Sequence, residues 1–110
     1  LTHIMPSCSF SSFADSICAM FHCSCNYIPH LLEYGESADV VGLTAPRPLV
    51  IVNGIHDPIF PLSAANVQFE CLRAIYAAAG APENCVHVLG DGEHRFYAEP
   101  AWNAMLKFWK

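Results

Sequence analysis

The sequence predicts an α/β fold in which a parallel sheet is flanked by helices, and three observations support this class. Residues 49–52 form an aliphatic run without polar alternation, for which we expect a strand over 49–53, and residues 85–89, with His87 among apolar residues, are expected to form a second strand. Such short continuous runs are typical of strands buried on both faces, as in a parallel sheet. Residues 64–79 lie between the runs with a helical pattern, and their length suits the crossover of a βαβ unit.

The region before the first clear strand is less regular. Residues 1–5 form a short apolar run ended by Pro6, and we expect a strand there. Residues 7–48 are expected to be a loop with helical turns, because serine, proline and glycine separate its apolar segments. Two such turns are expected at 28–34 and 38–43. A connection of this length is unusual in a compact domain unless it covers or lines a site.

Two helices are predicted in the second half of the chain. For residues 64–79 we expect Ser63 as the N-cap and Gly80 as a left-handed stop. The expected buried stripe of this helix consists of Val67, Cys71, Ala74, Ile75 and Ala78. Residues 99–110 are the expected final helix. Its aromatic and aliphatic residues on one side are Trp102, Leu106 and Trp109.

Composition excludes several classes of function. The chain has 110 residues, of which 54% are hydrophobic and 14% charged, as in a globular protein rather than a disordered one. Its formal net charge is -5 and its five cations are scattered, so we expect no nucleic-acid partner. No apolar run approaches the roughly 20 residues that cross a bilayer, so we expect no membrane span. No pattern specifies an oligomeric state.

Six cysteines raise the question of a disulfide or a metal site. They are too few for a disulfide scaffold, and Cys71 and Cys85 are expected in the core. A zinc module is an alternative for the cluster Cys18, His22, Cys23 and Cys25. The spacing argues against zinc, because no second pair of ligands follows at the usual distance. One local disulfide in this cluster and free thiols both stay open.

The candidate catalytic residues follow the two clear strands. Asp57 comes a few residues after the first strand, and His94 comes a few residues after the second. Parallel strands bring their carboxyl ends to one edge of the sheet, where ligands bind. A carboxylate bonded to one imidazole nitrogen fixes the ring tautomer and leaves the other nitrogen free to take a proton. The alternative is that Asp57 is a turn residue and His94 a solvated loop residue.

Five segments carry longer motifs, namely residues 23–29, 45–49, 53–61, 75–80 and 92–96. The most specific part is Ala-Pro-Arg-Pro at 45–48 followed by Gly-x-x-Asp at 54–57. Together these segments resemble the C-terminal part of an α/β-hydrolase, most of all the dienelactone-hydrolase-like and acetyl-xylan-esterase-like serine esterases. The resemblance implies that residues 1–110 are the C-terminal βαβα portion of a single α/β-hydrolase domain, which is then incomplete.

The resemblance also implies a function. Asp57 would be the acid and His94 the general base of a Ser-Asp-His triad, in the chain order that this fold uses. The implied reaction is hydrolysis of a small-molecule or carbohydrate ester, including acetyl esters, without a cofactor and without metal ligands.

The nucleophile of such a triad is missing from the sequence. No serine stands in G-x-S-x-G and no cysteine in G-x-C-x-G, and the earlier loop that would complete an oxyanion hole is also absent. We therefore expect the serine to lie upstream and the chain to be inactive alone. The alternative is a catalytically inactive, hydrolase-derived binding or structural module.

Several neighbours of the candidate pair carry two interpretations. Arg47 is expected to tie loops together through carboxylates rather than to bind substrate. Phe60, Phe96, Tyr97 and Trp102 would line the site or belong to the core. Glu93 either faces His94 or is exposed.

Overall fold

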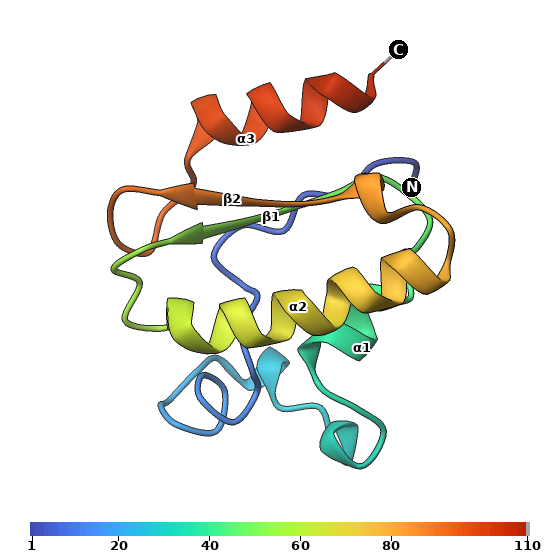
Figure 1. Ribbon diagram of the computed structural model, residues 1–110. Helices are drawn as coiled ribbons and strands as arrows, with labels where there is room; N and C mark the ends of the chain where they lie inside the picture. Colours follow the sequence, from blue (N-terminus) through green and yellow to red (C-terminus); the bar gives the residue numbers. More distant parts are fainter. Residues whose placement is uncertain (110) are drawn as a thin grey trace.

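The computed structural model describes residues 1–109 and contains a two-stranded parallel sheet with helices on both faces (Figure 1). Strand β1 (Leu49–Gly54) pairs with β2 (Cys85–Gly90) in register, so that Leu49 lies opposite Cys85 and Gly54 opposite Gly90. Helix α2 (Leu62–Ala78) connects the two strands. This arrangement confirms the predicted α/β class.

Alternate side chains of β1 build two cores, one on each face of the sheet. Leu49 and Ile51 pack on the face covered by α2, whereas Val50 and Val52 pack under α3 (Ala98–Met105). Figure 1 shows these two helices on opposite sides of the strands. All four side chains are fully buried. Each contributes roughly 1.5–3 kcal/mol of hydrophobic stabilisation, which explains the absence of polar alternation in this strand.

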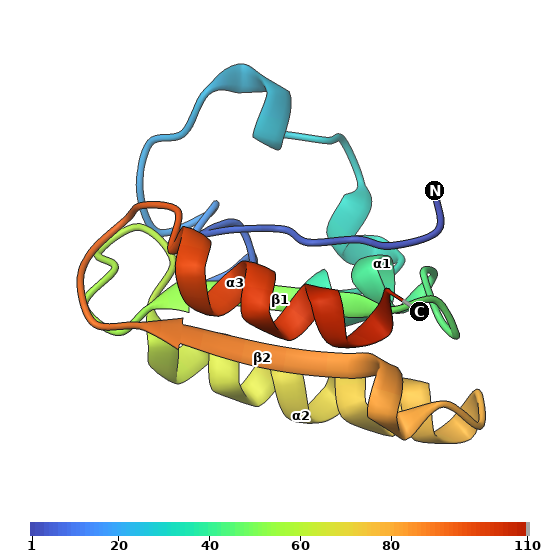
Figure 2. The same cartoon turned by 90° about the horizontal axis from the view of Figure 1, so that it is seen from above.

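The N-terminal segment runs along β1 on the side away from β2 (Figure 2). The expected strand at 1–5 is wrong in its bounds, because pairing occurs as two single parallel bridges, Ile4 with Leu49 and Ser7 with Val52. Pro6 has no N–H to donate, so it interrupts a regular ladder. The segment nevertheless pairs as far as Cys8, whose N–H donates to Val52 O at 2.8 Å.

The long connection at 7–48 contains three short helical pieces. They are η1 (Ser24–Asn26), η2 (Leu31–Glu33) and α1 (Ser37–Gly42), and α1 packs beside α2. The Glu36 carboxylate caps α1 by accepting from Ser37 N at 3.0 Å, and it also accepts from Phe13 N at 2.8 Å. One acidic side chain therefore fixes both the start of α1 and the loop before it.

Helix α2 buries a different face from the one expected. The buried residues are Ala64, Ala65, Gln68, Leu72 and Tyr76, whereas Val67 is 64% exposed and Cys71 is also exposed. Hydrogen bonds as well as apolar packing determine which face of α2 is buried. The Tyr76 hydroxyl donates to Arg47 O at 2.8 Å, and Gln68 accepts from Ala38 N at 3.0 Å. Both side chains are satisfied only when this face is turned inward.

The ends of α2 differ in how well the sequence predicted them. The N-cap is Pro61 rather than Ser63, so the helix begins earlier than expected. At the other end Gly80 has a φ of 74°, which is the left-handed conformation expected of it.

The structure confirms the expectation for one of the two cysteines that were predicted to be buried. All six are free, and Cys85 is buried as expected while Cys71 is not. Burial raises the pKa of the Cys85 thiol to about 11, so this thiol is unreactive at neutral pH.

The C-terminal helix is shorter than the expected 99–110. Helix α3 ends at Met105 and is followed by η4 (Leu106–Phe108), while residue 110 lies outside the described part of the chain. Its buried residues are Ala101, Ala104 and Met105, so the stripe with Trp102 and Leu106 is the outer face. No helix within residues 1–109 has the length and apolarity needed to cross a membrane.

A buried polar chain ties both strands to the N-terminal segment. Nε2 of His87, on β2, lies 3.0 Å from Oδ1 of Asn53. The Asn53 side-chain amide donates to Phe10 O at 3.0 Å. Asn53 is fully buried, and the ring of Phe69 packs on His87 at a centroid distance of 4.6 Å. Burial lowers the pKa of His87, and the neutral ring donates to Asn53.

We expect the free energy of unfolding to fall as pH is lowered through about 6.5, the ordinary pKa of histidine. Below this value the unfolded chain binds a proton at His87 that the folded chain does not, so stability rises with pH. The variant His87→Gln keeps a donor for Asn53 but does not titrate. Urea unfolding at pH 7.5 and pH 5.5 should show a smaller pH dependence in the variant. Equal pH dependence in both proteins would contradict this account.

Candidate active site

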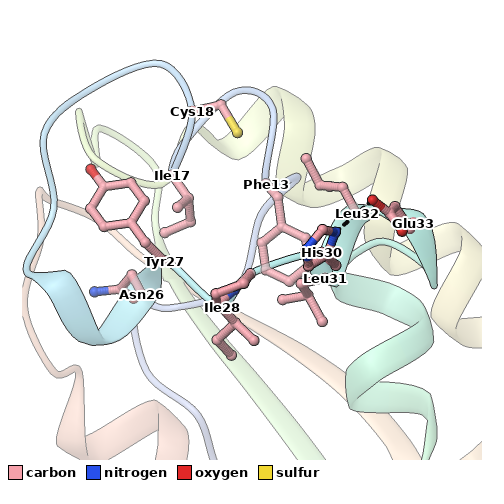
Figure 3. Close-up of a pocket in the computed structure, with 11 residues that line it drawn as sticks. Phe13, Ile17, Cys18, Asn26, Tyr27, Ile28, His30, Leu31, Leu32 and Glu33 are labelled. Carbon is pink, nitrogen blue, oxygen red and sulfur yellow. Dashed lines mark hydrogen bonds and ion pairs between the residues drawn. The ribbon is translucent and has the colours of Figure 1, made fainter.

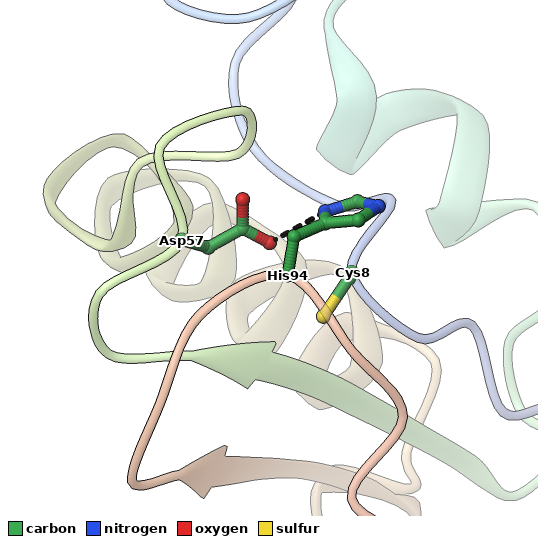
Figure 4. A group of neighbouring side chains, drawn as sticks. All are labelled: Cys8, Asp57 and His94. Carbon is green, nitrogen blue, oxygen red and sulfur yellow. Dashed lines mark hydrogen bonds and ion pairs between the residues drawn. The ribbon is translucent and has the colours of Figure 1, made fainter.

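The two loops that follow β1 and β2 bring Asp57 and His94 together, although the residues stand 37 apart in sequence. His94 Nδ1 lies 2.9 Å from Asp57 Oδ2, and Figure 4 shows the two side chains meeting between the loops. The Asp57 side chain is fully buried, and the His94 side chain is 40% exposed. A buried carboxylate therefore holds an imidazole that is partly exposed to solvent.

Backbone donors from the loop after β1 complete the surroundings of Asp57. Its Oδ1 accepts from Ile59 N at 2.8 Å and from Phe60 N at 3.0 Å. Burial by itself would raise the pKa of Asp57, but the hydrogen bonds from Phe60, Ile59 and His94 outweigh it and hold the pKa below its usual value. Asp57 is thus ionised at neutral pH, and a charged acceptor favours the proton on His94 Nδ1.

The second ring nitrogen of His94 is free to exchange a proton. Within residues 1–109, Nε2 of His94 makes no hydrogen bond. With Nδ1 protonated, Nε2 carries the lone pair of the neutral imidazole. His94 can therefore act as a base, and the Asp57 carboxylate fixes the orientation of its ring.

Close backbone packing sets the distance between the two loops. The Tyr97 hydroxyl donates to Glu93 O at 2.6 Å, and the ring lies against Gly90, where a Cβ would come 2.1 Å from it. A Cβ on Gly54 would come 2.3 Å from Glu93 O. The loops also pair directly, since His56 N donates to Gly92 O at 3.0 Å. Tyr97 is therefore a core residue that supports the His94 loop.

Phe60 forms a wall of the site, which is one of the two roles expected for it. Its ring stacks on His94 at a centroid distance of 5.8 Å, with an angle of 18° between the planes. The buried His22 also approaches the Phe60 ring edge-on, at a centroid distance of 5.6 Å. The long connection thus reaches the candidate pair through two aromatic contacts.

The other residues singled out from the sequence lie elsewhere. Phe96 and Trp102 are about half exposed, Glu93 is exposed, and Arg47 is exposed with no ion pair in the part of the chain that the structure describes. The expected carboxylate partner of Arg47 is therefore wrong. In the described chain, the cluster at 18–25 does not gather three ligand atoms at one point.

Cys8 is a member of the site that sequence reasoning missed. Its thiol donates to Arg95 O at 3.0 Å, beside His94, and its side chain is buried. The signal that was available is its place at the end of the first extended segment. The rule that identified Asp57 and His94 at strand ends would have identified Cys8 as well.

The long connection also contains an apolar cavity of about 430 Å³ (Figure 3). Phe13, Ile17, Tyr27, Ile28 and Leu31 are among its lining residues. A smaller cavity of about 200 Å³ shares several of these residues and extends to Phe60. The smaller cavity therefore extends to the Phe60 ring that stacks on His94.

The chain is similar to α/β-hydrolase-like esterases in sequence and in fold. No protein-family model matches the chain. Over 70 residues, or 64% of its length, it is 30% identical to the protein of Bacillus subtilis (strain 168) named "Putative hydrolase YtaP".

Two solved structures are similar in fold and sequence. A carbohydrate esterase family 15 glucuronoyl esterase from Caldicellulosiruptor kristjansonii superposes on 64% of this chain with a TM-score of 0.58 and 25% identity. Methylesterase BT1017 superposes on 74% with a TM-score of 0.56 and 27% identity. The chain spans 23% of the curated relative and 19% and 18% of the two solved chains. These likenesses support a relationship to ester hydrolases.

We expect nuclear magnetic resonance of the ¹⁵N-labelled chain at pH 7.5 to show His94 as the tautomer with its proton on Nδ1. In Asp57→Asn the charged acceptor is lost, so the ring nitrogen shifts of His94 should move toward a mixture of tautomers. The exposed neighbour His56 is the internal control, and its shifts should not change. Unchanged His94 shifts in the variant would contradict the assigned hydrogen bond.

We expect Gly90→Ala to lower the free energy of unfolding by about 1–3 kcal/mol or more, because the new methyl group overlaps the Tyr97 ring. Gly92→Ala is the matched control in the same loop, where the nearest atom to a new Cβ is the Tyr97 hydroxyl at 3.1 Å. Urea unfolding of both variants measures the difference. A Gly90 variant as stable as the Gly92 variant would show that this packing does not hold the loop.

Proposed function

We propose that this chain supplies the acid and the base of a serine ester hydrolase, with Asp57 as the triad acid and His94 as the general base. The observation that carries the proposal is the 2.9 Å contact between His94 Nδ1 and a fully buried, multiply hydrogen-bonded Asp57 carboxylate. Residues 1–110 would form the C-terminal part of a single α/β-hydrolase domain. The nucleophilic serine would then belong to an upstream segment.

The proposed reaction uses His94 twice. Its Nε2 takes the proton of the serine hydroxyl while the serine oxygen attacks the ester carbonyl carbon, and Asp57 stabilises the resulting imidazolium. The imidazolium returns this proton to the departing alkoxide, which leaves as the alcohol and an acyl-enzyme. Water then attacks the acyl-enzyme, with its proton passing through the same nitrogen, and the carboxylic acid is released.

The substrate is proposed to be a small-molecule or carbohydrate ester, hydrolysed without a cofactor. Two solved relatives are a glucuronoyl esterase and a methylesterase by name, which supports this class. The motifs at 45–61 favour the dienelactone-hydrolase-like and acetyl-xylan-esterase-like group within it. The hollow that ends at Phe60 offers space for an apolar part of the ester near His94.

A second candidate function is a hydrolase-derived binding or structural module without activity. It is favoured by one observation, the absence of a nucleophile motif anywhere in the 110 residues. The two functions differ in what the upstream reading frame contains. A G-x-S-x-G segment after a strand supports the hydrolase, and a stop codon without such a segment supports the module.

We expect His94→Ala, made in the chain joined to its upstream sequence, to lower kcat for p-nitrophenyl acetate by at least about 10³-fold. The physical reason is the loss of the group that takes the serine proton. Far-ultraviolet circular dichroism should be unchanged, because the His94 side chain is 40% exposed.

His56→Ala is the matched control for this experiment. His56 is exposed and stands next to Asp57, but its part in the loop is a backbone hydrogen bond that alanine keeps. Its kcat should stay within about threefold of the parent. Near-normal turnover of the His94 variant would remove His94 from the mechanism.

A further inference from the structure

Three different side-chain donors converge where three neighbouring parallel segments end. Cys8 follows the N-terminal segment, Asp57 follows β1 and His94 follows β2 (Figure 4). One sulfur, one nitrogen and one carboxylate oxygen from these residues all lie within 4.8 Å of one another. Within residues 1–109 this is the group of three ligand-type side chains that the fold brings to one point.

The donor set and its dimensions suit a divalent cation of intermediate softness. Zinc takes Cys sulfur at about 2.3 Å, His nitrogen at about 2.0–2.1 Å and carboxylate oxygen at about 2.0–2.2 Å, in tetrahedral geometry. Neighbouring ligand atoms around such an ion lie about 3.5 Å apart. The most separated ligand atoms, up to 4.8 Å apart, need to close by about 1.3 Å. His94 Nδ1 and Asp57 Oδ2, which lie 2.9 Å apart, need to open by about 0.6 Å.

Contacts in the structure hold the three donors close to one another. The Cys8 thiol already points at the His94 loop, since it donates to Arg95 O at 3.0 Å. Cys8 has a φ of 46°, a left-handed conformation that is costly for a residue other than glycine. Asp57 contributes a buried negative charge, and the 40% exposure of His94 leaves a path for the ion to enter.

We propose that Cys8, Asp57 and His94 form a binding site for a zinc-class divalent cation, with water at the fourth position. The thiol proton and any proton displaced from the imidazole pass to solvent, and no group is oxidised or reduced. Three protein ligands and one open position are the arrangement of accessible rather than purely structural zinc sites. This site departs from the sequence-based expectation of no metal ligands.

A cation bound at this site would reversibly inhibit the proposed hydrolysis. The ion engages an imidazole nitrogen of His94 and the carboxylate that orients it, so the metal-bound form has no free base. This consequence rests on the proposed function, whereas cation binding itself does not. If the chain binds the ion but the complete protein has no hydrolase activity, the proposed function is contradicted and the proposed cation site is not.

Cobalt(II) and zinc(II) are the probes for the experiment, used on the 110-residue chain with the four exposed cysteines replaced by serine. These cysteines are Cys18, Cys23, Cys25 and Cys71. We expect one cobalt ion per chain with an intense thiolate-to-metal charge-transfer band, which zinc displaces. Calorimetric titration with zinc should give the same stoichiometry.

Ligand variants in this background assign the site. Cys8→Ser should abolish the charge-transfer band, and His94→Gln and Asp57→Asn should each weaken zinc binding by more than about 100-fold, since loss of outer-shell partners alone costs 10–100-fold. Cys85→Ser is the matched control, because Cys85 is equally buried but packs in the core beneath α2. It should keep both the band and the affinity.

Two results would overturn the proposal. One is the absence of a stoichiometric ion in the background protein. The other is unchanged zinc affinity in His94→Gln, a test that stands even if the buried Cys8 variant fails to fold, because His94 is partly exposed.

Discussion

The buried carboxylate of Asp57 is the constraint on which the arrangement of this molecule's polar end depends. A carboxylate without access to water must find donors for its lone pairs, or ionisation becomes costly. Ile59 and Phe60 provide two backbone donors, which shapes the turn after β1, and His94 provides the third. The orientation of His94, the candidate base, therefore follows from the hydrogen bonds that the buried Asp57 carboxylate requires.

That constraint can be met only because the two strand ends lie side by side without offset. The parallel register places Gly54 opposite Gly90, and neither position has room for a side chain beside Tyr97 and the Glu93 carbonyl. The N-terminal segment adds a third strand end through the bond from Cys8 N to Val52 O. The end of the sheet thus brings together Cys8, Asp57 and His94, which come from distant parts of the sequence.

Much of this could be predicted from the sequence. The apolar runs identified β1 and β2, and the rule that ligands meet at strand ends paired Asp57 with His94. The buried face of α2 could not be predicted, because two apolar stripes have helical spacing, and the choice depends on backbone partners for Tyr76 and Gln68 in the distant segment 38–47. Cys8 was harder to predict, because Pro6 interrupts the pairing of its segment and the sequence shows no clear strand end there.

The pairing of residues 4–8 has a consequence for the edge of the sheet. A strand in a parallel ladder directs alternate residues to one neighbour, and Ile4, Pro6 and Cys8 direct their backbone groups to β1. The backbone groups of Met5 and Ser7 face the other way, and within residues 1–109 no backbone group pairs with them. Such an unpaired edge can form hydrogen bonds with a further strand. An uncovered edge favours intermolecular strand addition, so the tendency of the chain to associate in solution depends on the backbone groups of Met5 and Ser7, on either side of Pro6.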